Sequence, residues 1–311
     1  KEKAAEIEEA LQASAEASVK LDEQREVYRN FAWVGSRLYF IVETLRAVCH
    51  MYQFSLSSFL NLFKAALAKD MDRCSTEERL EKLCADLEVR VMYFVSRALF
   101  KADRLMFALH LIKGMHPEHF GAKEWEIFTG SLVASVSETV PRGFPSWAAN
   151  DRQAGYRLLL ENVPHLVDSL DLGNAPKWSR FSTSLEAERD IPAARGVSPW
   201  QKVLVVQAFR PDRLQSALLQ FCTDLLRVED VSPPPVSMAD IYAESSSKDP
   251  ILLISSPGAD ASKELTEYAT KTIGPGQYEE LAMGGGQQDV AIQLLRSAAS
   301  TGSWLCLKNL H

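Results

Sequence analysis

The sequence predicts a mainly helical chain with an α/β part at its C-terminal end. Apolar residues recur at steps of three and four along most of residues 28–229, as they do on amphipathic helices. After a triple proline at 233–235, short wholly apolar runs alternate with helical patterns, as in parallel α/β folds. The 311 residues allow about two domains, and their 46% hydrophobic and 24% charged content is ordinary for a globular protein.

Charge and composition exclude several classes of function. The net charge is −7, the pI is about 5.5 and no block of Lys and Arg occurs, so we expect no nucleic-acid partner. No apolar run reaches the roughly 18 residues that span a bilayer, so we expect no membrane insertion. The start of the chain has no signal peptide and no Met, which predicts a piece of a longer protein. Five scattered cysteines without a CxxC pair favour reduced thiols in the cytosol.

Residues 1–48 predict one long helix, because they contain no proline and Gly35 is their only glycine. Before Tyr28, large apolar residues are sparse, and Ser14 and Arg25 interrupt the coiled-coil spacing. After Tyr28, a wide apolar stripe predicts docking onto a core. Its members are Phe31, Val34, Leu38, Ile41, Val42, Leu45 and Val48.

Residues 49–136 predict further helices, with capping residues at their starts. Ser55 or Ser57 caps one helix, and Ser75 with Glu78 supplies both halves of a capping box for the next. The helical patterns that follow cover 80–99, 105–112 and about 123–136, with a stop at 114–117.

Residues 137–198 are broken up by prolines and glycines. Their interleaved aromatic residues are expected to pin short helices onto a core rather than to stack bases, since the segment has no surplus of cations. The next helix is predicted over 199–229, with Ser198 as its cap and Pro199 at its first position. Pro211 lies inside this helix and predicts a kink.

The triple proline at 233–235 is the sharpest linker signal in the chain, because such a run fits neither a helix nor a central strand. A parallel sheet of two or three strands is incomplete, so we expect the fold to continue beyond His311. The pattern after the linker predicts strands at 250–255, 277–283 and 304–307, helices at 263–271 and 288–300, and a tight turn at 284–286.

The loop after the first of these strands has the shape of a nucleotide phosphate site but lacks its charge. The functional motif, GxxxxGK[ST], requires a lysine that reaches the phosphates. Aligning Pro257 with the usual proline puts Ser262 in that place, and the other register puts Ala261 there. Lys263 is at least one place off, and Asp260 adds a negative charge where phosphates would lie. We therefore predict a degenerate phosphate loop made of Ser256, Pro257, Gly258, Ala259, Asp260, Ala261, Ser262 and Lys263.

The second half of such a site is an Asp-Glu pair at the end of the third strand. The Asp holds Mg²⁺ and the Glu orients the attacking water. In this chain, Lys308 and Asn309 follow the strand, and a cation and an amide can do neither task. We therefore predict no catalytic residue in this chain and no bound metal or nucleotide.

Three other patterns are weaker. The run from His116 to His119 resembles half a metal site, but the internal proline and the missing partner cluster favour a loop at a helix end. Residues 284–287, Gly-Gly-Gly-Gln, form either an anion site or a tight turn. Arg210-Pro211-Asp212-Arg213 is an interdomain salt bridge or a phosphate sensor, and the structural interpretation is favoured.

Five stretches of the chain are distinctive, at 51–56, 97–105, 209–214, 256–260 and 304–311. In this order they resemble the dynein heavy chain motor, late in its six-module AAA+ ring. The last stretch, Trp-Leu-Cys-Leu-Lys-Asn-Leu-His, is most similar to the cytoplasmic dynein 2 subfamily, which drives retrograde intraflagellar transport. Axonemal and cytoplasmic dynein 1 chains more often resemble Trp-Val-Leu-Leu-Gln-Asn there.

The resemblance implies three parts and an AAA+ helical lid followed by an incomplete P-loop-type parallel sheet. Residues 1–30 resemble the returning helix of the buttress, or strut, which braces the microtubule-binding stalk. Residues 31–197 resemble the small helical subdomain of the fifth module with its linking helices, and residues 198–311 the first half of the sixth module's large subdomain. In the family, the sixth module does not hydrolyse ATP. The family's Gly-Gln-Gly-Gln turn has Gly285 in place of the first glutamine, which puts a role for that side chain in doubt.

The function that the resemblance implies is mechanical. ATP and Mg²⁺ would act in other modules of a minus-end-directed microtubule motor, and this chain would be a rigid, non-hydrolysing relay toward the stalk. The implied partners are the neighbouring AAA+ modules and stalk, and, through the parent motor, microtubules and dynein intermediate and light chains. The implied location is the cytoplasm and cytoskeleton, and the cilium or flagellum for the dynein 2 type. Two alternatives stay open: a nucleotide-binding AAA+ module with an atypical loop, and a helical adaptor whose acidic arm binds a partner helix.

Overall fold

The computed structural model consists of two compact units, Lys1–Pro233 (unit 1) and Pro234–His311 (unit 2). Residues 2–68, 75–135, 139–192, 195–245, 250–253 and 261–310 are described, without the side chains of residues 2–11, 13 and 24. The boundary between the units falls inside the predicted triple-proline linker, where neither a helix nor a ladder can continue. Each unit is considered by itself below.

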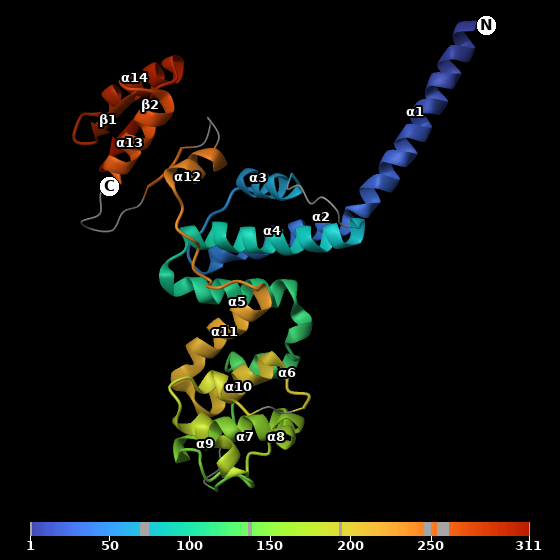
Figure 1. The fold of residues 1–311 in the computed structure, drawn as a ribbon, viewed down its shortest axis with the longest axis vertical. Helices are drawn as coiled ribbons and strands as arrows, with labels where there is room; N and C mark the ends of the chain where they lie inside the picture. The colour runs from blue at the N-terminus through green and yellow to red at the C-terminus, as the bar shows by residue number, and fades with distance from the viewer. Residues whose placement is uncertain are drawn as a thin grey trace. The chain divides into compact units, whose positions relative to one another are not determined.

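Unit 1 is built from helices, which confirms the mainly helical class expected for this part of the chain (Figure 1). The α-helices are α1 (Glu2–Val27), α2 (Arg29–Glu43), α3 (Leu56–Leu67), α4 (Thr76–Ala98), α5 (Arg104–Met115), α6 (Ala122–Phe128), α7 (Gln153–Asn162), α8 (Pro164–Leu170), α9 (Ala175–Thr183), α10 (Pro199–Phe209) and α11 (Leu214–Leu226). The 3-10 segments are η1 (Thr44–Ala47), η2 (Lys101–Asp103), η3 (Pro117–His119), η4 (Asn150–Arg152), η5 (Ala187–Arg189) and η6 (Pro211–Arg213).

Helix starts in unit 1 follow the predicted caps. Of the two candidates before α3, Ser55 is the cap, and its hydroxyl accepts the Ser58 N–H at 3.1 Å. The capping box of α4 is present, with Ser75 and Glu78 bonded to each other's backbone N–H at 3.3 and 3.4 Å. Helix α10 begins at Pro199, as predicted, and ends before Pro211, where η6 separates it from α11. A proline cannot donate the backbone hydrogen bond that would continue the helix.

The long helix predicted over 1–48 is interrupted at Tyr28. This residue has φ −91° and ψ 2°, and its N–H bonds the Arg25 carbonyl at 3.0 Å, three residues back rather than four. The chain continues as α2 and tightens into η1. The described side chains of α1 are exposed, whereas α2 packs one face against the core, as the change of composition at Tyr28 predicted.

A helix was predicted over about 123–136, but α6 (Ala122–Phe128) ends earlier, and the described residues 129–135 are not helical. The Thr129 hydroxyl bonds the Trp125 carbonyl at 3.0 Å, and Gly130 adopts φ +73°, which a glycine reaches without strain. A hydroxyl that competes for backbone groups and a left-handed glycine together stop the helix.

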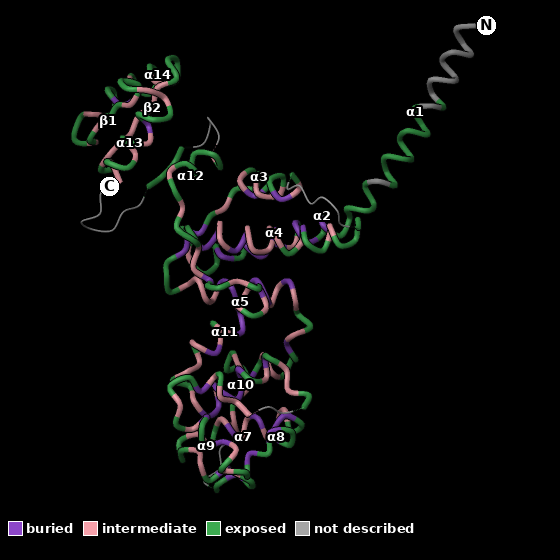
Figure 2. Tube along the Cα trace, viewed as in Figure 1, coloured by how far each residue is buried: buried purple, intermediate pink, exposed green. Residues whose placement is uncertain are grey.

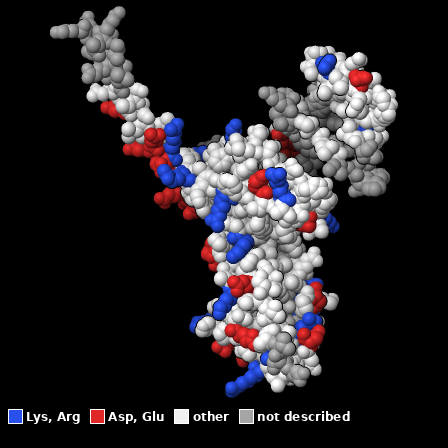
Figure 3. All heavy atoms as spheres, turned by 180° about the vertical axis from the view of Figure 1, so that it is seen from behind, with Lys and Arg blue, Asp and Glu red and all other residues white. Residues whose placement is uncertain are grey.

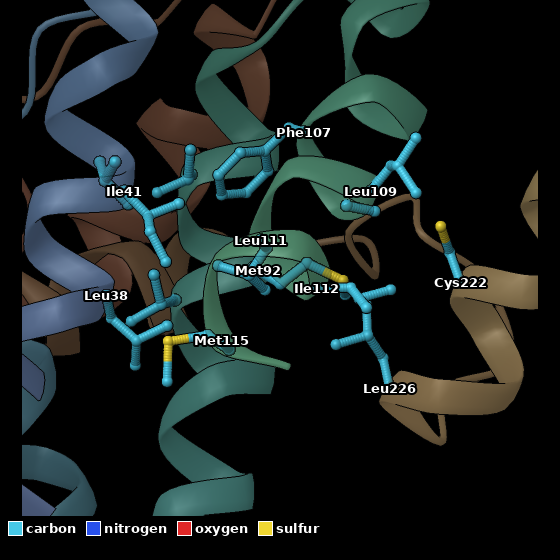
Figure 4. Packing of buried hydrophobic residues seen from close by; sticks show 14 of the residues in the cluster. Leu38, Ile41, Met92, Phe107, Leu109, Leu111, Ile112, Met115, Cys222 and Leu226 are labelled. Atoms are coloured by element: carbon cyan, nitrogen blue, oxygen red, sulfur yellow. The ribbon is translucent and has the colours of Figure 1, made fainter. Parts of the chain in front are cut away.

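The first hydrophobic cluster of unit 1 lies between α2, α4 and α5, with α11 packed against them (Figures 2 and 4). Leu38, Met92 and Ile112 are fully buried there, and Leu226 of α11 lies beside Ile112. The apolar stripe predicted on α2 is buried as far as Leu45, but Val48 is exposed.

The second cluster lies under α7, α8, α9 and α10, and it confirms the expectation that aromatic residues pin short helices onto a core. The Trp147 and Trp178 rings stack with centroids 5.2 Å apart. The indole N–H of Trp178 donates to the Leu170 carbonyl at 3.3 Å. Helices α7 and α10 approach closely at Gly155, where a Cβ atom would lie 2.9 Å from the Ala208 carbonyl oxygen.

Unit 2 has an α/β arrangement in its described residues, which agrees with the predicted C-terminal part. Its elements are α12 (Met238–Glu244), α13 (Ser262–Ile273), β1 (Tyr278–Ala282), α14 (Gln288–Thr301) and β2 (Trp304–Lys308). The strands are parallel, with Tyr278 paired to Trp304 and Ala282 to Lys308. Helix α13 packs on β1 and α14 on β2.

The strand predicted over 250–255 is wrong for its described part. Residues 250–253 form no ladder, and Leu252 is 70% exposed. A strand exists only through pairing, and an apolar run by itself specifies no partner. Residues 254 and 255 lie outside the described part.

The compact units do not follow the module assignment implied by the family resemblance. Helices α10 and α11 belong to unit 1, although 198–311 was assigned to the sixth module. Compactness measures contacts within this chain, whereas a module is a position in the family's ring, so the assignment stays a prediction. Across the described ranges, no helix is both long and apolar enough to cross a bilayer.

Candidate functional site

The candidate site is the face of the β1–β2 sheet that α13 covers. Paired residues of parallel strands share a face, so Glu280 lies on the same face as its partner Cys306 and near Lys308. The Thr266 hydroxyl of α13 lies 3.3 Å from the Glu280 carboxylate, which shows that α13 packs on this face. The Tyr268 ring, also on α13, lies 6.0 Å from the Trp304 ring.

Glu280 is the centre of the polar group on this face. Its carboxylate forms an ion pair with the Lys308 ammonium and accepts the Tyr278 hydroxyl at 2.8 Å. The hydrogen bond from Lys308, and then that from Tyr278, hold the pKa of Glu280 below its usual range. Burial raises the pKa of Tyr278, and its contacts with Glu280 and Cys306 raise it further. The carboxylate is therefore ionised and engaged inside the unit.

Lys308 ends β2, where the sequence placed the degenerate acidic pair. Its ammonium is directed to Glu280, with side chains 30% and 32% exposed, so a cation already neutralises this carboxylate. Asn309 follows with φ +58°, a left-handed conformation that ends the strand. Neither side chain can ligate Mg²⁺ as a carboxylate does, because an ammonium has no lone pair and an amide has no charge.

The phosphate loop is described only at its C-terminal end. Ser256, Pro257, Gly258, Ala259 and Asp260 lie outside the described residues. Ala261 precedes α13, and Ser262 is its first residue. Lys263 has an 87% exposed side chain, and its ammonium lies 3.9 Å from the Glu267 carboxylate, one turn along the same helix.

The glycine turn that precedes α14 is a compact turn, closed by a hydrogen bond from the Gln287 N–H to the Gly284 carbonyl at 3.2 Å. Gly286 has φ +82°, which explains a glycine at that position. The turn connects β1 to α14, in agreement with the tight-turn alternative.

The His116–His119 loop ends α5, as the favoured interpretation predicted. The His116 ring bonds Glu88 of α4 at 3.0 Å and lies 3.5 Å from Glu118. Within the described ranges, no group of three or more His, Cys, Asp or Glu side chains is arranged to hold a metal ion. These contacts assign the histidine to an ion pair between α4 and α5.

Two of the distinctive stretches meet in unit 1. The Tyr52 hydroxyl donates to the Asp103 carboxylate and accepts the Phe100 N–H at 3.1 Å. Burial, and then the bond to Asp103, raise the pKa of Tyr52. Residues 51–56 and 97–105 are thus joined by one buried side chain.

Sequence reasoning located Lys308 and Asn309 but missed Glu280 and Tyr278. The alternation of side chains along 277–283 would have put both on one face of a strand. Which residue of the second strand lies opposite them depends on the register, and no residue pattern in the sequence fixed it.

Charge on the visible face of unit 1 is mixed in sign. Figure 3 shows Lys and Arg side chains interspersed with Asp and Glu on this face, without an extended basic surface. This agrees with the acidic overall composition.

Comparison with known proteins agrees with the distinctive stretches. Residues 246–311 match the dynein heavy chain region D6 P-loop domain. The chain is 42% identical over 314 residues, which cover 100% of it, to the cytoplasmic dynein 2 heavy chain 1 of Tripneustes gratilla. The chain is homologous to a segment of the dynein heavy chains.

Other dynein heavy chains agree over the same length. Identity is 41% over 313 residues, or 98% of the chain, to the cytoplasmic dynein 2 heavy chain 1 of Homo sapiens. It is 41% over 315 residues, or 100% of the chain, to that of Chlamydomonas reinhardtii. The chain spans 7% of the length of each of these relatives. The matched P-loop domain covers the α/β elements of unit 2 from α13 onward.

Proposed function

We propose that this chain is a non-hydrolysing structural section of a microtubule motor of the cytoplasmic dynein 2 type, acting in retrograde intraflagellar transport. It relays a conformational change from other modules of the ring, which bind ATP and Mg²⁺, to the stalk. Its direct partners are neighbouring modules and the stalk of the same heavy chain. Microtubules and the intermediate and light chains are partners through the parent motor, which works on the cytoskeleton and in the cilium.

The observation that carries the absence of hydrolysis is the ion pair between Lys308 and Glu280. A metal held at this strand end would meet an ammonium group, and the Glu280 carboxylate beside it is already bonded to Lys308, Tyr278 and Thr266. The side chain of Lys263 supports the same conclusion, because it is exposed and paired along its own helix.

The test of the vestigial loop uses the full heavy-chain motor with Lys263→Ala. We expect basal ATPase, microtubule-stimulated ATPase and the amount of bound nucleotide to stay within about twofold of the wild type, because an exposed ion pair contributes little. Lys271→Ala, in the last turn of the same helix, is the matched control. A loss of bound nucleotide in Lys263→Ala alone would favour the nucleotide-binding alternative.

The test of the relay uses Leu21→Pro in the same motor. A proline in the interior of α1 breaks the helix at a cost of about 3 kcal/mol. We expect basal ATPase to persist while microtubule stimulation falls at least about tenfold, because α1 would no longer transmit force. Leu21→Ala keeps the helix and serves as the control. Unchanged microtubule stimulation in Leu21→Pro would contradict the relay.

A further inference from the structure

The Arg210-Pro211-Asp212-Arg213 motif lies at the corner where α10 ends and α11 begins. The Arg210 guanidinium donates through Nη1 to the carbonyl oxygens of Phe181, Ser182 and Ser184, at 3.0, 3.1 and 3.2 Å. These carbonyls belong to the last turn of α9 and the residue that follows it. Arg210 therefore caps the C-terminal end of a helix that lies about thirty residues away along the chain.

The remaining donors of Arg210 are held by Asp212. Nε lies 3.0 Å from Oδ1, and Nη2 lies 2.8 Å from Oδ2, so the carboxylate fixes the plane of the guanidinium. The hydrogen bond to Asp212 raises the pKa of Arg210 and lowers that of Asp212. All three nitrogens are used inside unit 1, which argues against a phosphate sensor.

Arg213 makes the second attachment, to Glu188 of η5. Its Nε and Nη2 atoms donate to the two carboxylate oxygens at 3.0 and 2.6 Å, a bidentate pair. The Glu188 side chain is 8% exposed. Burial raises the pKa of Glu188, but the hydrogen bonds from Arg213, a backbone hydrogen bond and the nearby positive charges of Arg213 and Arg189 together lower it below its usual value.

The two arginines bind one segment of the chain at two places. Residues 181–188 include the end of α9 and most of η5, and they are attached to the corner between α10 and α11 by five hydrogen bonds from Arg210 and Arg213. Arginine suits this position because its planar guanidinium can hold several oxygens at fixed angles, which a lysine cannot do.

We propose that Arg210 and Arg213 form a lock that holds residues 181–188 on the corner between α10 and α11, and that the relay of the proposed function passes through this lock. The lock makes the end of α9 and η5 move as one body with α10 and α11. This proposal rests on the proposed function for its second half, but its first half concerns unit 1 alone.

The experiment uses the full motor carrying Arg210→Lys with Arg213→Lys, which keeps both positive charges. We expect hydrogen exchange of the backbone amides at 181–190 to accelerate at least about tenfold, with basal ATPase unchanged and microtubule stimulation reduced. The matched control is Arg189→Ala, which removes an exposed pair with Glu186 in the same segment, at 3.2 Å and with side chains 66% and 60% exposed. The control leaves all three quantities unchanged.

Each outcome decides one half of the proposal. Unchanged exchange at 181–190 overturns the lock, whatever the motor does. Faster exchange in a motor whose ATPase is still fully stimulated by microtubules overturns the role of the lock in the relay. Full microtubule stimulation of the ATPase in Leu21→Pro would overturn the relay itself. Where the double variant unfolds, Arg213→Lys alone is measured, because it leaves Arg210 and its three carbonyl contacts in place.

Discussion

Unit 1 encloses Trp178, Trp200 and Phe107 completely, whereas the buried apolar side chains described in unit 2 are Ala269 and Ala291. The elements of unit 2 are held together by other contacts within the unit. These are a parallel strand pair, the polar group around Glu280, and the packing of Trp304 with the Tyr242 and Tyr268 rings. Apolar burial is worth about 25 cal/mol per Å², while partly exposed ion pairs are worth about 1 kcal/mol or less. The contrast teaches that unit 1 has a fully buried core of large side chains, whereas the described part of unit 2 depends on strand pairing, polar contacts and partly buried aromatic rings.

The largest effect is expected where the core of unit 1 is emptied. Trp178→Ala removes a stacked ring and leaves the Leu170 carbonyl without its indole donor, so the free energy of unfolding should fall by about 3–5 kcal/mol. Trp304→Ala in unit 2 should lower it by about 1–2 kcal/mol, because that ring is only partly buried. Denaturant titration measures both, and Trp33→Ala is the control, because Trp33 is 51% exposed. Equal losses at Trp178 and Trp304 would break the contrast.

A smaller effect tests how tightly unit 1 is packed. In Gly155→Ala the new methyl group would lie 2.9 Å from the backbone oxygen of Ala208, so α7 and α10 must separate. We expect a loss of about 1–3 kcal/mol in denaturant titration. Gly173→Ala meets no atom within 4 Å and should be neutral or slightly stabilising. A neutral Gly155→Ala would show that the two helices are not in fixed contact.

The smallest effect is a pH dependence within unit 1. The hydrogen bond that the His116 ring donates to the Glu88 carboxylate raises the pKa of His116, although burial opposes it. The ion pair between His116 and Glu88 therefore stabilises the folded state fully below about pH 6.5, the pKa of the histidine in the unfolded chain. This stabilisation is lost as the pH rises through the higher pKa of the folded state. Because the His116 side chain is 37% exposed, the amount should be below about 1 kcal/mol.

The measurement compares unfolding of the wild type and Glu88→Gln at several pH values. His110 has a pKa lowered by burial and contributes a slope of the opposite sign in both proteins. The difference between the two curves isolates His116 and should shrink as the pH rises. A difference that is constant with pH would rule out the ion pair.

Much of unit 1 could be predicted from its sequence, because helix signals are local. The capping box at Ser75 and Glu78, the proline at the start of α10 and the break at Pro211 each depend on a few neighbouring residues. The helix after Lys123 was predicted too long, since its apolar pattern continues past Gly130, whose left-handed backbone ends it.

The candidate site was predicted only in part, because its strands depend on pairing. Lys308 was found at a strand end, but its partner Glu280 could not be, since the register between β1 and β2 joins residues far apart in the sequence. The apolar run at 250–253 shows the same difficulty, because it pairs with neither strand.

The pair between Lys308 and Glu280 has an evolutionary consequence. A single Lys308→Asp substitution would place a second carboxylate beside Glu280, and two neighbouring carboxylates repel each other. Placing an acidic side chain at this strand end therefore lowers stability unless Glu280 changes first, and a change at Glu280 removes its ion pair with Lys308. Either single substitution therefore loses the ion pair, so residues 280 and 308 are expected to change together among related sequences.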